Sequence, residues 1–103
     1  MNPVDWHAQA AGVLAATETM LRHAEAQDWS SLAEAEAGRK PALARLLPAP
    51  AAVDPAAVLA FIEAVLASDQ RTARLVGESR DEAGQALRGL MAAGHARRAY
   101  GGA

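Results

Sequence analysis

The sequence predicts an all-α protein: an antiparallel helical hairpin and a long third helix, together a three-helix bundle. Strong helix formers dominate the composition, with 28 alanines and many Leu, Glu, Arg and Gln residues. Strand-favouring residues are scarce, since the chain has one Ile, one Phe, one Tyr and three Thr. Apolar residues recur at three- and four-residue intervals, which is the helical period. A length of 103 residues suits one domain with one modest core.

Two helices are expected in the first half of the chain, over about 5–26 and about 29–47. Asp5 is predicted to cap the first helix, and Asp28 or Ser30 the second. Short polar side chains accept hydrogen bonds from the free N–H groups at helix starts. The link between the two helices is short and polar, which predicts an antiparallel hairpin.

Large apolar residues of this hairpin are predicted to form its core. Trp6 and Trp29 are expected to anchor the two ends, and Leu32 lies on the apolar stripe of the second helix. Gly38 and Pro41 fall inside that helix. Because proline lacks a backbone N–H, a kink or a short break is expected there.

A linker over 48–54 precedes the third helix. Asp54 followed by Pro55 is a strong start signal, an N-cap with proline at the first helical position. No proline follows, so the long helix is expected over about 55–100. A helix of that length would extend ~69 Å, against ~30 Å for each helix of the hairpin. The alternative is a break near Gly77 and a fourth helix that folds back.

The hairpin can cover only about half of such a helix, so the apolar side chains of the other half need another cover. Either the helix folds back, or it presents these side chains to a partner or to a second copy in a homodimer. Interior glycines make this half the least stable part of the molecule. The predicted partner-binding residues are Val76, Leu87, Leu90, Met91 and Tyr100.

Two carboxylates lie on apolar stripes, Glu36 on the second helix and Asp69 on the third. Such groups can act as an acid and a base, but a structural interpretation is simpler. We expect a buried or half-buried pair with Arg39 or Arg71, or a polar device that fixes helix register. Glu36, Arg39 and Asp69 are therefore assigned a structural role.

The sequence predicts no metal, cofactor or catalytic site. His7 and His23 lie sixteen residues apart on one helix, too far for one metal ion, and no His-x-x-x-His or Glu-x-x-His spacing occurs. The serines have no histidine and acid at a recognisable spacing. A phosphate-binding glycine loop would need a preceding strand, and no strand is expected. We expect neither an enzyme nor a cofactor.

Charge and hydropathy argue against nucleic-acid binding and membrane insertion, so the expected partners are proteins. The net charge is −2 with both signs mixed, so the basic face of a nucleic-acid-binding protein is missing. The absence of Cys fits a reducing compartment. No apolar run reaches the ~20 residues that span a bilayer. The N-terminus lacks the layout of a signal peptide. We expect a cytoplasmic protein without membrane insertion.

Several segments resemble one protein family. The stretch 24–32, followed by Glu36 and Arg39, resembles the junction of helices 1 and 2 in FliT-type flagellar export chaperones. In these proteins an acidic-Trp pair opens the second helix, and a Leu, a Glu and often an Arg follow. The stretch 59–75 resembles their long third helix, and the tail 98–101 their terminal Ala-Tyr element. The resemblance covers about residues 6–101 and rests on the order, the spacing and the length of these segments.

This resemblance implies a function. Members are helical proteins that bind the C-terminal segment of the filament cap protein FliD and keep it soluble. They deliver it to the flagellar type III export apparatus, including the gate protein FlhA and the export ATPase complex. The resemblance assigns Tyr100 to docking at the gate. It implies a cap-binding apolar surface that includes Val76, Leu87, Leu90 and Met91.

The sequence also departs from the family pattern. Longer members continue past the Ala-Tyr element with a segment linked to self-inhibition, and some of these longer members also restrain the flagellar master transcription regulator. Because this sequence ends three residues after Tyr100, the resemblance leaves both roles open. Gly38 and Pro41 also depart from the expected second helix. The alternatives are a self-associating adaptor or structural protein, and a regulator of flagellar transcription acting through protein contacts.

Overall fold

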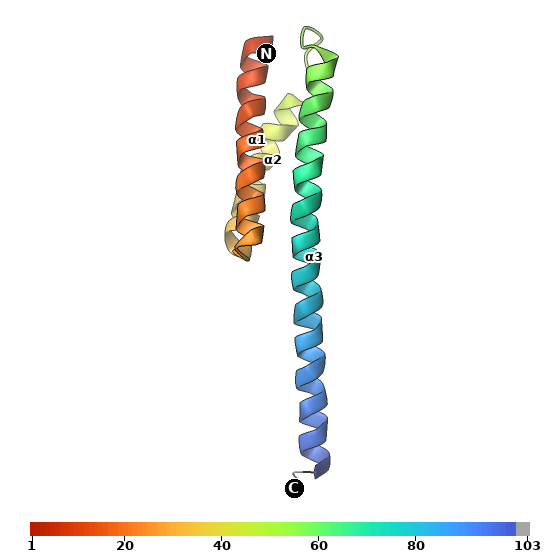
Figure 1. The fold of residues 1–103 in the computed structure, drawn as a ribbon. Helices are drawn as coiled ribbons and strands as arrows, with labels where there is room; N and C mark the ends of the chain where they lie inside the picture. The colour runs from red at the N-terminus through yellow and green to blue at the C-terminus, as the bar shows by residue number, and fades with distance from the viewer. Residues whose placement is uncertain (101–103) are drawn as a thin grey trace. The chain divides into compact units, whose positions relative to one another are not determined.

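The structure, a computed structural model, describes residues 1–100 and consists within that range of three α-helices (Figure 1). Helix α1 spans Pro3–Glu25, α2 spans Trp29–Leu46 and α3 spans Pro55–Tyr100. The prediction of an all-α fold is confirmed. The chain divides into two compact units, of which the first comprises Met1–Ala73 and the second begins at Arg74. Helix α3 contributes to both.

Helix α1 begins two residues earlier than predicted because Asn2, and not Asp5, caps it. The side-chain oxygen Oδ1 of Asn2 accepts a hydrogen bond of 2.8 Å from the backbone N–H of Asp5. Pro3 occupies the first turn, where a missing N–H costs nothing and the fixed φ favours the helix. Asp5 instead places its negative charge in the first turn, where it complements the helix dipole.

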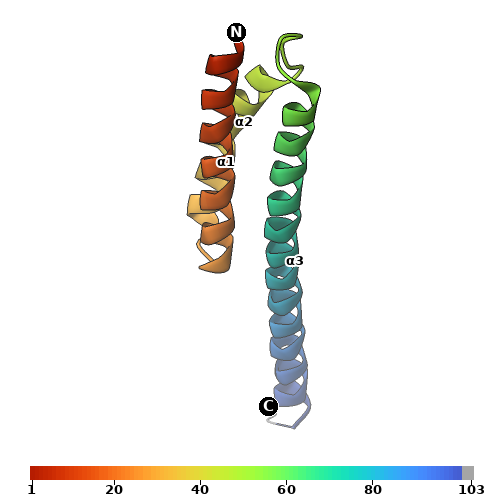
Figure 2. The same ribbon diagram turned by 45° about the horizontal axis from the view of Figure 1, so that its top comes forward.

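The chain reverses between α1 and α2 through a Schellman turn. The N–H of Asp28 donates to the carbonyl of His23 and the N–H of Gln27 to that of Ala24, at 2.9 and 3.0 Å. Gln27 adopts the left-handed conformation that this turn requires, with φ of 57°. Within the first unit α1 and α2 therefore run antiparallel, as Figure 2 shows. The predicted hairpin is present.

Asp28 caps the start of α2. Its Oδ1 accepts a hydrogen bond of 3.2 Å from the backbone N–H of Ser31. Hydrogen bonds from the side chain and the backbone of Ser31 hold the pKa of the Asp28 carboxyl below its usual 3.8. The carboxylate is therefore the form that supports the start of α2 at neutral pH.

Helix α2 continues through Gly38 and Pro41, so the predicted break does not occur. The proline ring leaves the carbonyl of Ala37 without its usual donor four residues on. Ala37, Gly38 and Pro41 are all exposed, and water can satisfy that carbonyl. The cost of an interior proline is thus lowered by placing it on the solvent side.

The core of the first unit is centred on Trp6, which is 1% exposed. Its indole Nε1–H donates a hydrogen bond of 3.0 Å to the backbone carbonyl of Leu46, the last residue of α2. A carbonyl at this position has no partner within its own helix. The Trp6 ring also meets Phe61 of α3 edge to face, with 5.5 Å between the centroids. The other buried members of this cluster are Ala10, Val13, Leu46, Val53 and Val65.

The inward face of α3 in the first unit differs from the predicted stripe. The apolar spacing of the sequence places Leu59, Val65 and Leu66 on one stripe, but of these three only Val65 is buried. Phe61 and Thr72, which are not on that stripe, are buried with Val65, four residues before it and seven residues after it. Two further differences concern aromatic and linker residues: Trp29 is only half-buried, and Val53 of the linker is buried.

Helix α3 runs without a break past Gly77, so the alternative of a fourth helix that folds back is not observed. Residues 74–100 of α3 are the described part of the second unit. Gly101, with which the resemblance of the tail 98–101 ends, lies outside the described residues.

Trp6→Phe should lower the free energy of unfolding of the first unit by about 1–3 kcal/mol, because it leaves the buried carbonyl of Leu46 without its donor. Urea unfolding followed by circular dichroism measures this loss. Trp29→Phe is the matched control, since Trp29 is half-buried and its replacement should cost less. Equal losses in the two variants would contradict the role of the indole N–H.

Candidate partner-binding surfaces

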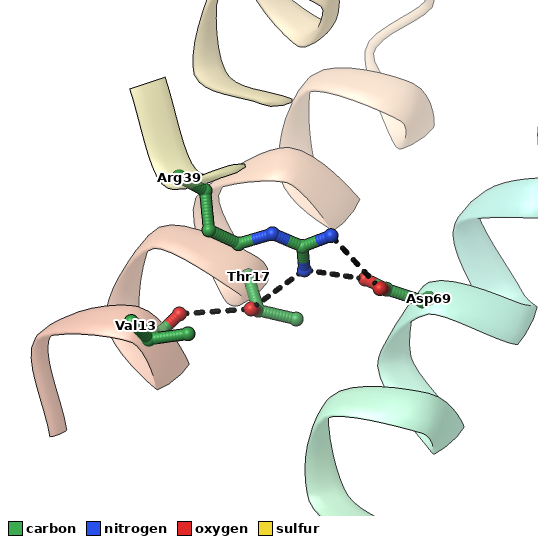
Figure 3. A network of polar contacts seen from close by, with 4 residues as sticks. All are labelled: Val13, Thr17, Arg39 and Asp69. Atoms are coloured by element: carbon green, nitrogen blue, oxygen red, sulfur yellow. Dashed lines mark hydrogen bonds and ion pairs between the residues drawn. The ribbon is translucent and has the colours of Figure 1, made fainter. Parts of the chain in front are cut away.

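A polar network joins the three helices of the first unit, with Arg39 of α2 at its centre (Figure 3). The guanidinium makes a two-pronged contact with Asp69 of α3, through Nη1–Oδ1 at 2.8 Å and Nη2–Oδ2 at 2.9 Å. Nη1 also donates to Oγ1 of Thr17 on α1 at 2.9 Å. The Thr17 hydroxyl in turn donates to the carbonyl of Val13 at 2.8 Å. One arginine thus binds a group from each of the other two helices.

This network fixes where α3 lies along the hairpin. The side chain of Arg39 is 10% exposed and that of Asp69 is 31% exposed, so solvent screens the pair only in part. The net gain from such a pair is small, but removing one partner leaves a poorly solvated charge. Of the two arginines considered for Asp69, the structure therefore selects Arg39, and Arg71 is exposed.

Glu36 lies outside this network, which corrects the expectation that it sits on the buried stripe of α2. Its side chain is exposed. The guanidinium of Arg39 is already bound to Asp69, and a carboxylate without a partner remains in water, where it keeps its hydration. Thr17 is the member that the sequence did not identify, because a threonine within an apolar stripe gives no sign of its acceptor role.

The second unit exposes large apolar side chains along one side of α3. Leu90 is 71% exposed, and Leu87 and Met91 are each more than half exposed. Their spacing of three and four residues places them on one face of the helix. Val76 lies on the same face, eleven residues before Leu87, and is half-buried. We call Val76, Leu87, Leu90 and Met91 the α3 stripe.

Tyr100 forms a separate surface near the end of α3. Its side chain is 92% exposed. Nine residues separate it from Met91, which is about two and a half helical turns. The two side chains therefore point to opposite sides of the helix. The predicted partner-binding residues thus fall into two groups, the α3 stripe and Tyr100.

A shallow groove runs between α1 and α2 and has a volume of about 520 Å³. Small side chains make its floor, and Arg39 and Arg45 border it. The groove brings no acid and base together and has no titratable pair facing into it. The sequence did not predict this groove, because it forms where small residues of α1 and α2 leave space between the two helices. The small residues that line it are Gly12, Ala16, Ala35, Gly38 and Ala42.

Metal-binding geometry is not found in the part of the chain that the structure describes, where no three His, Asp or Glu side chains gather. None of the helices described there combines the length and the hydropathy needed to cross a bilayer. The exposed chemistry of residues 83–100 is apolar and cationic, which suits contact with another polypeptide.

Over residues 7–102 the chain matches the family described as flagellar protein FliT. No curated protein and no solved structure matches it.

Asp69→Ala should lower the free energy of unfolding by about 1–2 kcal/mol, because it removes charge-assisted hydrogen bonds. The partial exposure of Asp69 keeps this loss small. Asp81→Ala, at an exposed site, is the control. The double variant Arg39→Met, Asp69→Leu should recover part of the loss, because it leaves no unpaired charge. Chemical denaturation of this double variant and of its two single variants, Arg39→Met and Asp69→Leu, gives the coupling energy, and strictly additive losses would contradict the network.

Proposed function

The chain belongs to the FliT family of flagellar proteins, a chaperone family, and we propose that it binds the C-terminal segment of the filament cap protein FliD. In this proposal it keeps the cap subunit soluble in the cytoplasm and delivers it to the export gate. The observation that carries the proposal is the exposure of the α3 stripe in a chain of this family. Monomeric proteins seldom leave several large apolar side chains together in water without a binding purpose.

The energetics of the stripe support a helical partner. Burying one large apolar side chain is worth about 1.5–3 kcal/mol. Leu87, Leu90 and Met91 have the i, i+3, i+4 spacing by which one helix packs against another. Three such side chains would contribute about 4.5–9 kcal/mol when fully buried, and association itself costs about 4 kcal/mol or more, so a partner helix must also make contacts beyond these three. The half-buried Val76 would add contact at the other end of the stripe.

Delivery to the gate is assigned to Tyr100. The side chain is almost fully exposed and faces away from Met91, so it remains accessible when a partner covers the stripe. Tyrosine also suits a protein interface, because it combines a large apolar ring with a hydroxyl. We include the gate protein FlhA and the export ATPase complex as partners on the basis of the family.

The α3 stripe would equally serve self-association, in which a second copy covers it. The same side chains would then be buried in a homodimer, and the chain would act as a structural or adaptor protein. Light scattering on the purified chain separates the two functions. A monomer, or a dimer that dissociates when the cap protein is added, favours the chaperone. A dimer that persists in the presence of the cap protein favours self-association.

Leu90→Ser should weaken binding of the cap protein at least tenfold, because it removes about 1.5–3 kcal/mol of apolar burial from the interface. Calorimetric titration of the full chain with the cap protein measures the change. Leu59→Ser is the matched control, since Leu59 is 56% exposed in the first unit and should leave binding unchanged. Both positions are exposed, so neither variant should impair folding. Equal affinities in the two variants would rule out the stripe as the binding surface.

Tyr100→Ala should leave cap binding intact and weaken binding to the gate protein. The reason is that Tyr100 lies on the opposite side of α3 from Met91. Pull-down assays with the cap protein and the soluble part of the gate protein test the two interactions in parallel. An equal loss of both interactions would contradict the separate assignment of Tyr100.

A further inference from the structure

The charge around Leu87, Leu90 and Met91 of the α3 stripe is opposite in sign to that of the whole chain. Residues 83–100 contain three arginines and no carboxylate, whereas the 103-residue chain has a net charge of −2. The three acidic residues of the second unit, Glu78, Asp81 and Glu82, all precede this segment. Leu87, Leu90 and Met91 thus lie in the most basic segment of the helix.

Two of the arginines lie along the stripe itself. The Arg88 Nη1 atom would be 3.5 Å from a Cβ added at Gly84, and the Arg98 Nη1 atom 3.8 Å from one added at Gly94. Each guanidinium therefore extends back over the preceding turn, as long helical side chains do. Both glycines are half-buried among exposed neighbours, which is consistent with this cover.

The two glycines mark the positions of these charges on the helix surface. Gly84 precedes Met91 by seven residues, and Gly94 follows Leu87 by seven, which is about two turns in each case. Gly84 therefore shares a face with Met91, and Gly94 shares one with Leu87. The guanidinium groups of Arg88 and Arg98 flank the exposed apolar side chains along the helix axis.

The helix itself explains only part of this charge. Arg98 lies in the last turn, where a cation complements the free carbonyls of the helix end. Arg88 lies twelve residues before Tyr100, and the dipole effect does not reach beyond the last turn. Within residues 1–100 the one ion pair formed is that between Arg39 and Asp69, so no carboxylate there neutralises Arg88 or Arg98. The nearest polar contact of Arg98 is with the His95 ring, at 3.3 Å.

We infer that the α3 stripe accepts an amphipathic helix whose apolar face is flanked by carboxylates, and that Arg88 and Arg98 select this partner by charge. The inference rests on the proposed function, because it specifies the chemistry of the segment that the stripe binds. The apolar side chains supply the affinity, and the arginines discriminate among apolar helices by the charges beside their apolar faces. A carboxylate opposite each guanidinium can form charge-assisted hydrogen bonds of fixed geometry.

A protein helix is favoured over an anionic membrane as the occupant. Helices that lie in a membrane interface present a broad apolar face, commonly with Trp or Phe. The second unit contains no Trp or Phe, and glycines 84, 89 and 94 interrupt its apolar side chains. The three exposed large side chains, Leu87, Leu90 and Met91, match one neighbouring helix better than a lipid surface.

Two designed helical peptides of about 20 residues test the inference, since shorter helices are marginal in water. Both carry the same leucine stripe, flanked by Glu in one peptide and by Lys in the other. Fluorescence anisotropy with the full chain should show roughly tenfold tighter binding of the Glu peptide, and raised salt should reduce this preference. Equal affinity for the two peptides would overturn the inference.

Charge reversal at the two arginines provides the second measurement. Arg88→Glu with Arg98→Glu should reverse the preference, so that the Lys peptide binds more tightly than the Glu peptide. Arg22→Glu with Arg74→Glu changes the net charge equally at exposed positions away from the stripe and should leave the preference unchanged. A similar reversal in the control pair would show a net-charge effect and overturn the inference.

Two further probes separate this inference from its alternatives. Vesicles of phosphatidylglycerol that bind the chain through Arg88 and Arg98, without any peptide preference, would assign the segment to a lipid surface and overturn it. Binding of the cap protein to these variants is the second probe. If Leu90→Ser loses this binding and Arg88→Glu with Arg98→Glu retains it, the charge selection is overturned and the proposed function stands. Peptide preference without any cap binding would refute the proposed function alone.

Discussion

The indole of Trp6 is the group on which the packing of the first unit depends. It gives the last carbonyl of α2 a hydrogen bond that this helix cannot provide for itself, and it packs its ring edge to face with Phe61. A single side chain of α1 thereby contacts both other helices. In a chain with few aromatic residues, the large area that tryptophan buries makes this contact difficult to replace.

The Arg39 network complements that apolar contact by giving it direction. The hydrophobic effect has no preferred direction, whereas the paired hydrogen bonds between Arg39 and Asp69 require one alignment of the two helices. Thr17 completes the arrangement by accepting from Arg39 and donating to the backbone of its own helix. The first unit therefore combines a contact that buries a large aromatic side chain with one that specifies the alignment of α3.

Much of the fold could be predicted because the local signals were strong. The proline and acid at the start of α3 located that boundary, and the polar residues around Asp28 located the turn. The start of α1 was predicted less well, since two acceptable caps, Asn2 and Asp5, lie within one turn. Pro41 showed the limit of a local rule, because α2 continues through it where the carbonyl that it frees lies on the exposed side and can reach water.

The inward face of α3 and the partner of Asp69 could not be predicted for a common reason. Around Phe61 the helix carries apolar or small residues on nearly every side, so periodicity alone did not separate the face with Leu59 from the face with Phe61. Arg39 and Arg71 were likewise equivalent until the position of α2 against α3 was known. The exposure of Leu87, Leu90 and Met91 followed from a comparison of helix lengths, which needed no such detail.

The unbroken course of α3 has a consequence for how its second half becomes ordered. Starting a helix is slow and unfavourable because several residues must be fixed before the first hydrogen bond forms, whereas adding a residue to an existing helix costs little. Residues 55–73 are held by the core and serve as a ready-made nucleus for the residues after Ala73. Helical order in this glycine-containing segment should decline gradually toward Tyr100, with amide exchange quickening turn by turn.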